Sequence, residues 1–148
     1  MRSLVLEYAV EPHEMALAEF QAKLSLETDP SDVHADLEKG ETGFVVLDAR
    51  SPEAYALGHV PSAINLPHRR IDASTAASLP RDKVLVTYCN GAGCNASTKA
   101  ALKLTTLGFK VKEMLGGLDW WKRDGYSVAV GIAPDSEGVI ASHVKCGC

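Results

Sequence analysis

The feature that most constrains the fold is an apolar strand that runs into a cysteine, a glycine-containing loop and then a helix. Residues 84–88 form the strand (VLVTY), Cys89 ends it, and helical spacing of apolar residues begins after Asn95. Strands that alternate with helices are typical of an α/β layer with a parallel sheet. Functional sites in such sheets lie beyond the carboxyl ends of strands. The sequence therefore predicts a functional thiol at Cys89.

The loop after Cys89 predicts an anion-binding cradle. Successive backbone N–H groups in a curved loop can converge on one point, and the helix that follows adds unpaired donors and partial positive charge. A thiol in this setting ionises more readily than a free cysteine, which makes it a better nucleophile. The predicted cradle for an anion or a persulfide comprises Asn90, Gly91, Ala92, Gly93, Cys94 and Asn95.

Further elements follow from the pattern of apolar residues. The run at 44–47 predicts a strand covered on both faces, and 63–66 predicts a shorter strand. The alternation at 109–113 predicts a half-exposed strand near a sheet edge. Helices are expected over 11–27, from Ser31 to Gly40, over 96–107 and over 118–124, with Ser31 as the cap of the second. We expect an α/β domain over 31–130. Residues 1–30 are expected to form an extension whose amphipathic helix packs on the domain, and 131–148 a flexible tail with a Cys-x-Cys pair.

Composition limits the classes of partner. The chain has 148 residues, 46% of them hydrophobic, and a formal charge of −4, so neither nucleic acid nor a membrane is expected as a partner. No apolar run approaches the roughly 20 residues of a membrane span, and the first residues do not resemble a signal peptide. We therefore expect a cytoplasmic protein whose four cysteines are thiols rather than a structural disulfide frame. Its oligomeric state is left open.

Several spaced motifs occur together in this chain. They are Leu47-Asp48-Ala49-Arg50 with Glu53 and Tyr55, the stretch 58–67 (GHVPSAINLP), Tyr88-Cys89 with its loop, and Leu115-Gly116-Gly117-Leu118 with Trp120 and Trp121. In this order they resemble the rhodanese (sulfurtransferase) family, as a single-domain member, with Ser62 where glycine is more usual.

The resemblance implies a three-layer fold with a mostly parallel five-stranded sheet and helices on both faces. It implies transfer of a sulfane sulfur, from thiosulfate or a persulfide donor, to a thiol or to cyanide. The sulfur would be carried as a persulfide on Cys89, with no cofactor or metal. The implied partners are a small sulfur donor and a thiol acceptor, with a protein persulfide as another donor.

The loop departs from the usual family pattern at three positions. Ala92 takes the usual place of glycine, Cys94 stands where arginine is frequent, and Asn95 replaces a hydroxyl residue but can still cap the helix. The displaced glycines, Gly91 and Gly93, can still supply positive φ angles. Without the arginine we expect weaker binding of thiosulfate and a larger role for neutral or protein-borne persulfides. No arginine lies between Cys89 and Lys99, which disfavours phosphoryl chemistry.

Cys94 leaves the mechanism open. It could attack a Cys89 persulfide, releasing hydrosulfide and leaving a disulfide, or the two cysteines could work as a thiol/disulfide oxidoreductase. Alternatively Cys94 is a buried, inert side chain. A third reading of the whole chain is a non-catalytic binding module with the rhodanese fold.

Other side chains are candidates for supporting roles. Asp48 and Arg50 end a central strand and could form a buried ion pair, tune the active loop or, for Arg50, add positive charge to the pocket. His68 and Arg69 could present positive charge at the pocket mouth or form a solvated turn. We expect a structural role for His59. The tail residues Cys146 and Cys148 are candidate resolving thiols and only a weak metal signal.

Overall fold

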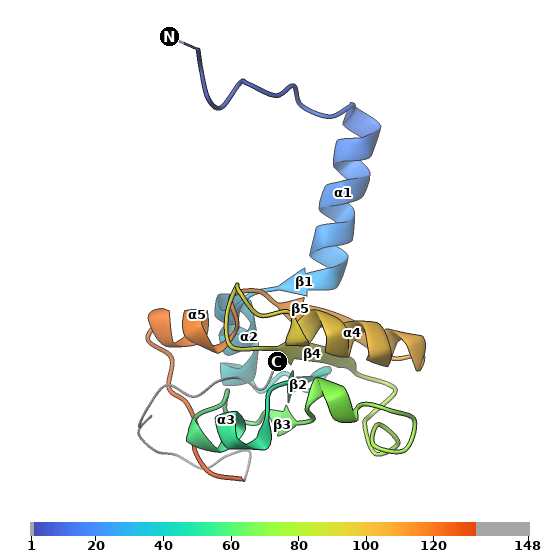
Figure 1. Ribbon diagram of the computed structural model, residues 1–148, viewed down its shortest axis with the longest axis vertical. Coiled ribbons are helices and arrows are strands. Elements are labelled where there is room, and N and C mark those ends of the chain that lie inside the picture. The colour runs from blue at the N-terminus through green and yellow to red at the C-terminus, as the bar shows by residue number, and fades with distance from the viewer. Residues whose placement is uncertain (1, 133–148) are drawn as a thin grey trace.

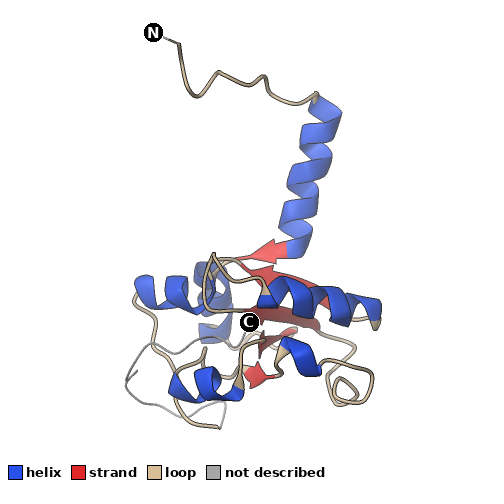
Figure 2. Ribbon diagram, in the orientation of Figure 1, coloured by secondary structure: helices blue, strands red, loops and turns tan. Residues whose placement is uncertain are grey.

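The computed structural model describes residues 2–132, which form three layers around a parallel sheet (Figures 1 and 2). The five strands lie in the order β1-β5-β4-β2-β3, and all of their pairings are parallel. The strands are β1 (Glu27–Thr28), β2 (Phe44–Asp48), β3 (Ile64–Asn65), β4 (Val84–Tyr88) and β5 (Lys110–Met114). The helices are α1 (His13–Leu26), α2 (Pro30–Glu38), α3 (Pro52–Leu57), the 3₁₀ turn η1 (His68–Arg70), α4 (Ala96–Thr106) and α5 (Gly117–Arg123).

Two hydrophobic clusters hold the layers together, one on each face of the sheet. Alternate residues of a strand point to opposite faces, so β2 and β4 supply both clusters. On one face Val46, Val86 and Tyr88 pack with Val33 of α2, Tyr55 of α3, and Leu118 and Trp121 of α5. On the other face Leu47 and Leu85 pack with Ala96, Ala100 and Leu104 of α4, and Cys89 belongs to this second cluster. The cysteine thus lies on the α4 side of the sheet.

The predicted α/β fold, with a five-stranded sheet and helices on both faces, is confirmed. The strands over 44–48 and 84–88 and the helix after the cysteine loop lie where the pattern placed them. Two details differ. Asp29, not Ser31, caps α2, because its side chain accepts a hydrogen bond from the Asp32 amide at 2.9 Å. The edge of the sheet beside β5 is β1, an unpredicted two-residue strand that begins at the last residue of the segment expected to be helical.

The helix predicted over 11–27 exists as α1, but the expectation that it packs on the domain is wrong. No residue of α1 is buried, and the helix stands away from the domain beyond the edge strand (Figure 1). Five of its large apolar side chains are more than half exposed: Met15, Leu17, Phe20, Leu24 and Leu26. At 100° per residue the first and last of these lie opposite the other three, so they form no single apolar face. Since α1 leads directly into β1, it continues past the sheet edge instead of crossing a face of the sheet.

The tail expected over 131–148, including Cys146 and Cys148, lies outside the described residues from position 133 onward. Within the described part of the chain, no helix has the length and apolar character needed to cross a bilayer.

Candidate active site

Cys89 follows the last residue of β4 and is 2% exposed. It is joined by a disulfide to Cys94, five residues later, with a Cα–Cα distance of 6.3 Å. The expectation of free thiols is therefore wrong for this pair. The sulfur of Cys94 is bonded to that of Cys89, which excludes the alternative that Cys94 is an isolated, inert core thiol.

The amino end of α5 holds the first part of the cysteine loop through backbone hydrogen bonds. The amide of Leu118 donates to the Cys89 carbonyl at 3.0 Å, and the amide of Asp119 donates to the Asn90 carbonyl at 2.8 Å. Gly117 permits this approach, because its φ is +59° and a Cβ there would collide with the Cys89 carbonyl oxygen. The Gly116-Gly117 pair therefore positions the active loop as well as starting α5.

The loop differs from the predicted cradle in its details. Neither Gly91 nor Gly93 has a positive φ, so their expected conformational role is wrong. A Cβ at Gly91 would lie 2.5 Å from Oδ2 of Asp119, so a larger residue there would displace that exposed side chain. The Cys94 amide donates to the Gly91 carbonyl at 3.1 Å, which closes a turn. Asn95 occupies the cap position of α4, but its side chain makes no capping hydrogen bond.

A buried ion pair connects the end of β2 to the loop. Arg50 donates from Nη2 to Oδ2 of Asp48 at 2.7 Å and from Nε to Oδ1 at 3.0 Å. The same guanidinium donates to the Gly58 carbonyl at 2.6 Å and to Oδ1 of Asn90 at 3.2 Å. Burial opposes the charged form of Arg50, but the charge and hydrogen bonds of Asp48, together with Tyr88, outweigh burial and raise the pKa of the guanidinium. Asp48 and Arg50 thus hold the loop in place, and Arg50 is committed to protein partners instead of facing a pocket.

Tyr88 completes this buried network, a role that its sequence position did not indicate. Its hydroxyl donates to Oδ2 of Asp48 at 2.5 Å and accepts from the Val60 amide at 3.1 Å. Burial and the adjacent Asp48 carboxylate raise the pKa of Tyr88 well above its ordinary value. The residue immediately before Cys89 is therefore anchored in its neutral form.

A small pocket of about 160 Å³ lies beside the cysteine pair. It is lined by the loop, the first turn of α4 and the carboxyl end of β5: Cys89, Gly91, Ala92, Cys94, Ser97, Thr98, Glu113, Met114, Leu115, Gly116 and Gly117. Glu113 is a site residue that the sequence analysis missed. Glu113 lies in β5, the parallel neighbour of β4, where it is paired with Thr87. A carboxylate near the carboxyl end of the predicted strand over 109–113 was the sequence feature that could have indicated its place in the site.

The remaining candidates lie away from this pocket. His68 is buried in η1 and Arg69 is exposed beside it, and among the described residues neither belongs to the pocket lining. His59 is buried, stacks on Tyr55 at 3.7 Å between ring centroids, and contacts the Tyr55 carbonyl through Nδ1 at 2.8 Å. These contacts agree with the structural role predicted for His59.

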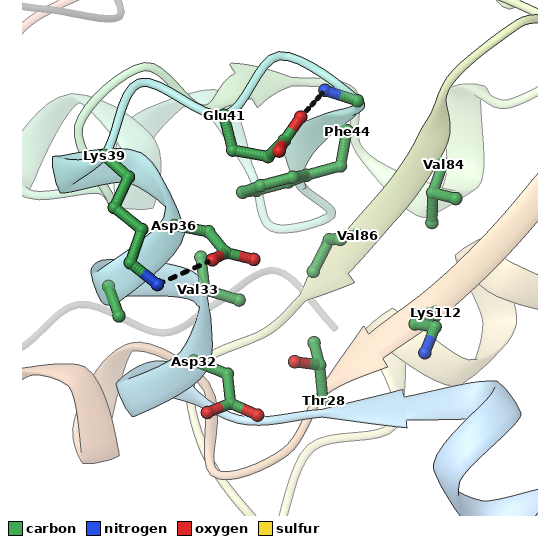
Figure 3. Close-up of a pocket in the computed structure, with 12 residues that line it drawn as sticks. Thr28, Asp32, Val33, Asp36, Lys39, Glu41, Phe44, Val84, Val86 and Lys112 are labelled. Atoms are coloured by element: carbon green, nitrogen blue, oxygen red, sulfur yellow. Dashed lines mark hydrogen bonds and ion pairs between the residues drawn. The ribbon is translucent and has the colours of Figure 1, made fainter.

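A larger cavity of about 580 Å³ lies at the other end of the sheet, between α2 and the amino ends of β2 and β4 (Figure 3). Its apolar wall includes Phe44 and Val86, and part of its charged rim is paired. Lys39 lies 3.8 Å from Asp36, and Glu41 accepts from the amides that follow it. None of the residues that line this cavity belongs to the cysteine loop.

Comparison with known proteins places this geometry in a family. The model of the rhodanese-like domain matches residues 29–124. The chain is 37% identical over 84 residues to the thiosulfate sulfurtransferase GlpE of Pseudomonas fluorescens, covering 55% of this chain and 73% of that protein. It is also 37% identical over 103 residues to the HTH-type transcriptional regulator Rv0324 of Mycobacterium tuberculosis. That match covers 69% of this chain but only 45% of the regulator, so the chain spans less than half of that relative.

Solved structures agree with these matches. The BH2092 protein of Bacillus halodurans superposes with a TM-score of 0.78 at 40% identity, covering 82% of this chain and 88% of that one. The rhodanese-like domain of the Alr3790 protein from Anabaena gives a TM-score of 0.64 at 26% identity, covering 80% and 93%. The fold, the cysteine at the end of β4 and the family match over residues 29–124 agree: the chain belongs to the rhodanese-like family.

Proposed function

We propose that this protein is a sulfurtransferase that carries sulfane sulfur as a persulfide on Cys89. The observation that carries the proposal is the position of Cys89 at the carboxyl end of β4, in a loop held by α5 and by the Arg50 guanidinium. The names of several relatives, thiosulfate sulfurtransferases, support the same reaction class.

The proposed reaction has two displacements. The Cys89 thiolate attacks the sulfane sulfur of thiosulfate or of a persulfide donor. A bond forms between Sγ and that sulfur while the donor's S–S bond breaks, and the leaving sulfite or thiolate takes the electron pair. A thiol acceptor, as its thiolate, or cyanide then attacks the terminal sulfur, and Cys89 departs as a thiolate. The disulfide to Cys94 must be reduced before this cycle can begin.

The disulfide favours a second candidate function, thiol/disulfide exchange between Cys89 and Cys94. The two chemistries can also be consecutive. The Cys94 thiolate would attack Sγ of the Cys89 persulfide, so that the intramolecular disulfide forms and hydrosulfide leaves with the electron pair of the broken bond. A further thiol would then reduce the disulfide and be oxidised in turn.

Variants of the two cysteines separate these functions. We expect Cys89→Ser to abolish sulfur transfer from thiosulfate or a low-molecular-weight persulfide to cyanide. Cys94→Ser should retain that transfer in reduced protein and lose disulfide cycling. Loss of transfer in both variants, with transfer in the wild type, would favour a mechanism that obligatorily uses the disulfide. Failure of the wild type with every donor, together with a stable protein partner, would favour a binding module.

A further inference from the structure

The pocket beside Cys89 contains a single carboxylate and no cation. Of its lining residues, all of which are described, Glu113 alone carries an acidic side chain, and none is Lys, Arg or His. The pocket is small, at about 160 Å³, so a donor presenting its sulfur to Cys89 lies close to Glu113. At a few ångströms, charges at a protein surface interact by several times the thermal energy. The charge of Glu113 therefore bears directly on which donors can approach.

Two hydroxyl groups fix the position of this carboxylate. Oε2 of Glu113 accepts from the Thr98 hydroxyl at 2.9 Å and from the Ser97 hydroxyl at 3.1 Å. Both donors belong to the first turn of α4, where the helix dipole places partial positive charge. The protein thus already presents a negative group to the helix end that would otherwise attract an anionic donor.

The groups around the loop do not restore positive charge. Asp119 does not line the pocket, and its carboxylate, which lies next to Gly91, adds negative charge near the loop. Arg50 is 3% exposed and bound to Asp48, Gly58 and Asn90. Lys122 is exposed and does not line the pocket. The electrostatic balance near Cys89 is therefore unfavourable to a multiply charged anion.

We propose that Glu113 determines donor specificity, by selecting sulfane-sulfur donors of low net negative charge over the thiosulfate dianion. This inference rests on the proposed persulfide chemistry of Cys89 and names its substrate class. The attacking thiolate is itself negative, so a dianionic donor meets repulsion from both groups. A donor whose negative charge is compensated within the molecule meets much less, and the pocket offers it the Glu113 carboxylate as a partner.

Three donors with the same reactive bond test this inference. Thiosulfate is a dianion, methanethiosulfonate a monoanion, and 2-aminoethanethiosulfonate a zwitterion without net charge. Each loses its sulfane sulfur from a sulfonyl sulfur, so the bond broken is similar while the charge changes. With cyanide as the acceptor and thiocyanate as the product, we expect kcat/KM of the reduced wild-type protein for the donor to rise in that order.

The variant Glu113→Gln keeps the acceptor for Ser97 and Thr98 and removes the charge. It should raise kcat/KM for thiosulfate on the order of tenfold and that for methanethiosulfonate about threefold. The value for the zwitterionic donor should change less than about twofold. Added salt should raise the wild-type rate with thiosulfate by screening and should have a smaller effect in Glu113→Gln. Glu19→Gln removes the same charge from α1, remote from the pocket, and should leave all three donors unchanged.

Two results would overturn the proposal in distinguishable ways. If all three donors load sulfur on Cys89 but Glu113→Gln changes them by the same factor, the charge of Glu113 does not select the donor and the inference alone fails. If none of the donors loads sulfur on Cys89 of reduced protein, as judged by intact mass, the proposed function fails and the inference with it.

Discussion

Arg50 donates from Nη1 to Oδ1 of Asn90 at 3.2 Å, which ties the end of β2 to the residue directly after Cys89. The two residues are 40 positions apart, and the guanidinium is otherwise held by Asp48 and by the Gly58 carbonyl. The loop that contains the reactive cysteine is thus fastened to the buried centre of the sheet. This contact, with the backbone bonds from α5, accounts for the position of Cys89.

Removing the Asn90 side chain should loosen the attachment of the cysteine loop to Arg50 and leave the fold intact. We expect Asn90→Ala to lower the free energy of unfolding by about 1–2 kcal/mol, because Arg50 keeps its other partners. Because Cys89 is only 2% exposed, loosening the loop should expose its sulfur, and the rate at which iodoacetamide alkylates Cys89 in reduced protein should rise several-fold. Asn95→Ala is the matched control, because the Asn95 side chain makes no capping bond in the same loop. Equal effects of the two variants would contradict a special role for the Arg50 contact.

A side chain at Gly117 should disrupt the site more than one at another glycine of similar φ. Gly117→Ala introduces both a positive-φ penalty and a collision with the Cys89 carbonyl, whereas Gly125 has φ +82° and open space around its Cβ position. We expect Gly125→Ala to cost about 1–2 kcal/mol of unfolding free energy. Gly117→Ala should cost at least about 1 kcal/mol more by urea denaturation. It should also speed alkylation of Cys89, because the displaced loop leaves this buried thiol more accessible. Similar losses in both would mean that the collision is relieved without consequence.

Ser62 is a position at which glycine should stabilise the protein. It is the one non-glycine residue with positive φ in the described chain, at +70°. We expect Ser62→Gly to raise the free energy of unfolding by about 0.5–1 kcal/mol, after the greater entropy of glycine in the unfolded chain is subtracted. Ser62→Ala keeps the strained backbone and should give no such gain in thermal or urea unfolding. A gain from alanine as large as that from glycine would show that loss of the hydroxyl is the cause.

The raised pKa of Tyr88 predicts a specific loss of stability at alkaline pH. Above about pH 10 the unfolded chain releases the phenolic proton while the folded protein keeps it, so unfolding becomes easier as pH rises. In Tyr88→Phe this contribution, up to about 1.4 kcal/mol per pH unit, should disappear.

At neutral pH the same variant should be less stable by about 2–3 kcal/mol, because the hydrogen bond to the Asp48 carboxylate is lost. Tyr8→Phe, at an exposed position, should keep the wild-type pH dependence in urea titrations from pH 8 to 11. An unchanged slope in Tyr88→Phe would contradict the account of its ionisation.

The sequence predicted the layered fold and the place of Cys89 because both depend on local pattern. Apolar runs identify buried strands such as 44–48, and the change from strand to loop to helix marks the end of β4. The position of α1 was not predicted correctly, because its large apolar side chains lie on opposite sides of the helix and form no single face that must pack on the domain. Glu113 and Tyr88 were missed because their roles depend on which strands are neighbours and on which face a side chain lies, and these follow from the complete topology.

In the proposed reaction Cys89 carries the transferred sulfur, and the intact mass of the protein after incubation with a donor reveals whether it does. Fully reduced wild-type protein is incubated with the donor series and freed of excess donor before mass analysis and peptide mapping. We expect an added mass of one sulfur atom on the peptide containing Cys89, its removal by cyanide, and its retention in Cys94→Ser. No added sulfur on Cys89 with any of these donors, or an equal amount of added sulfur in Cys89→Ser, would mean that Cys89 is not the sulfur carrier.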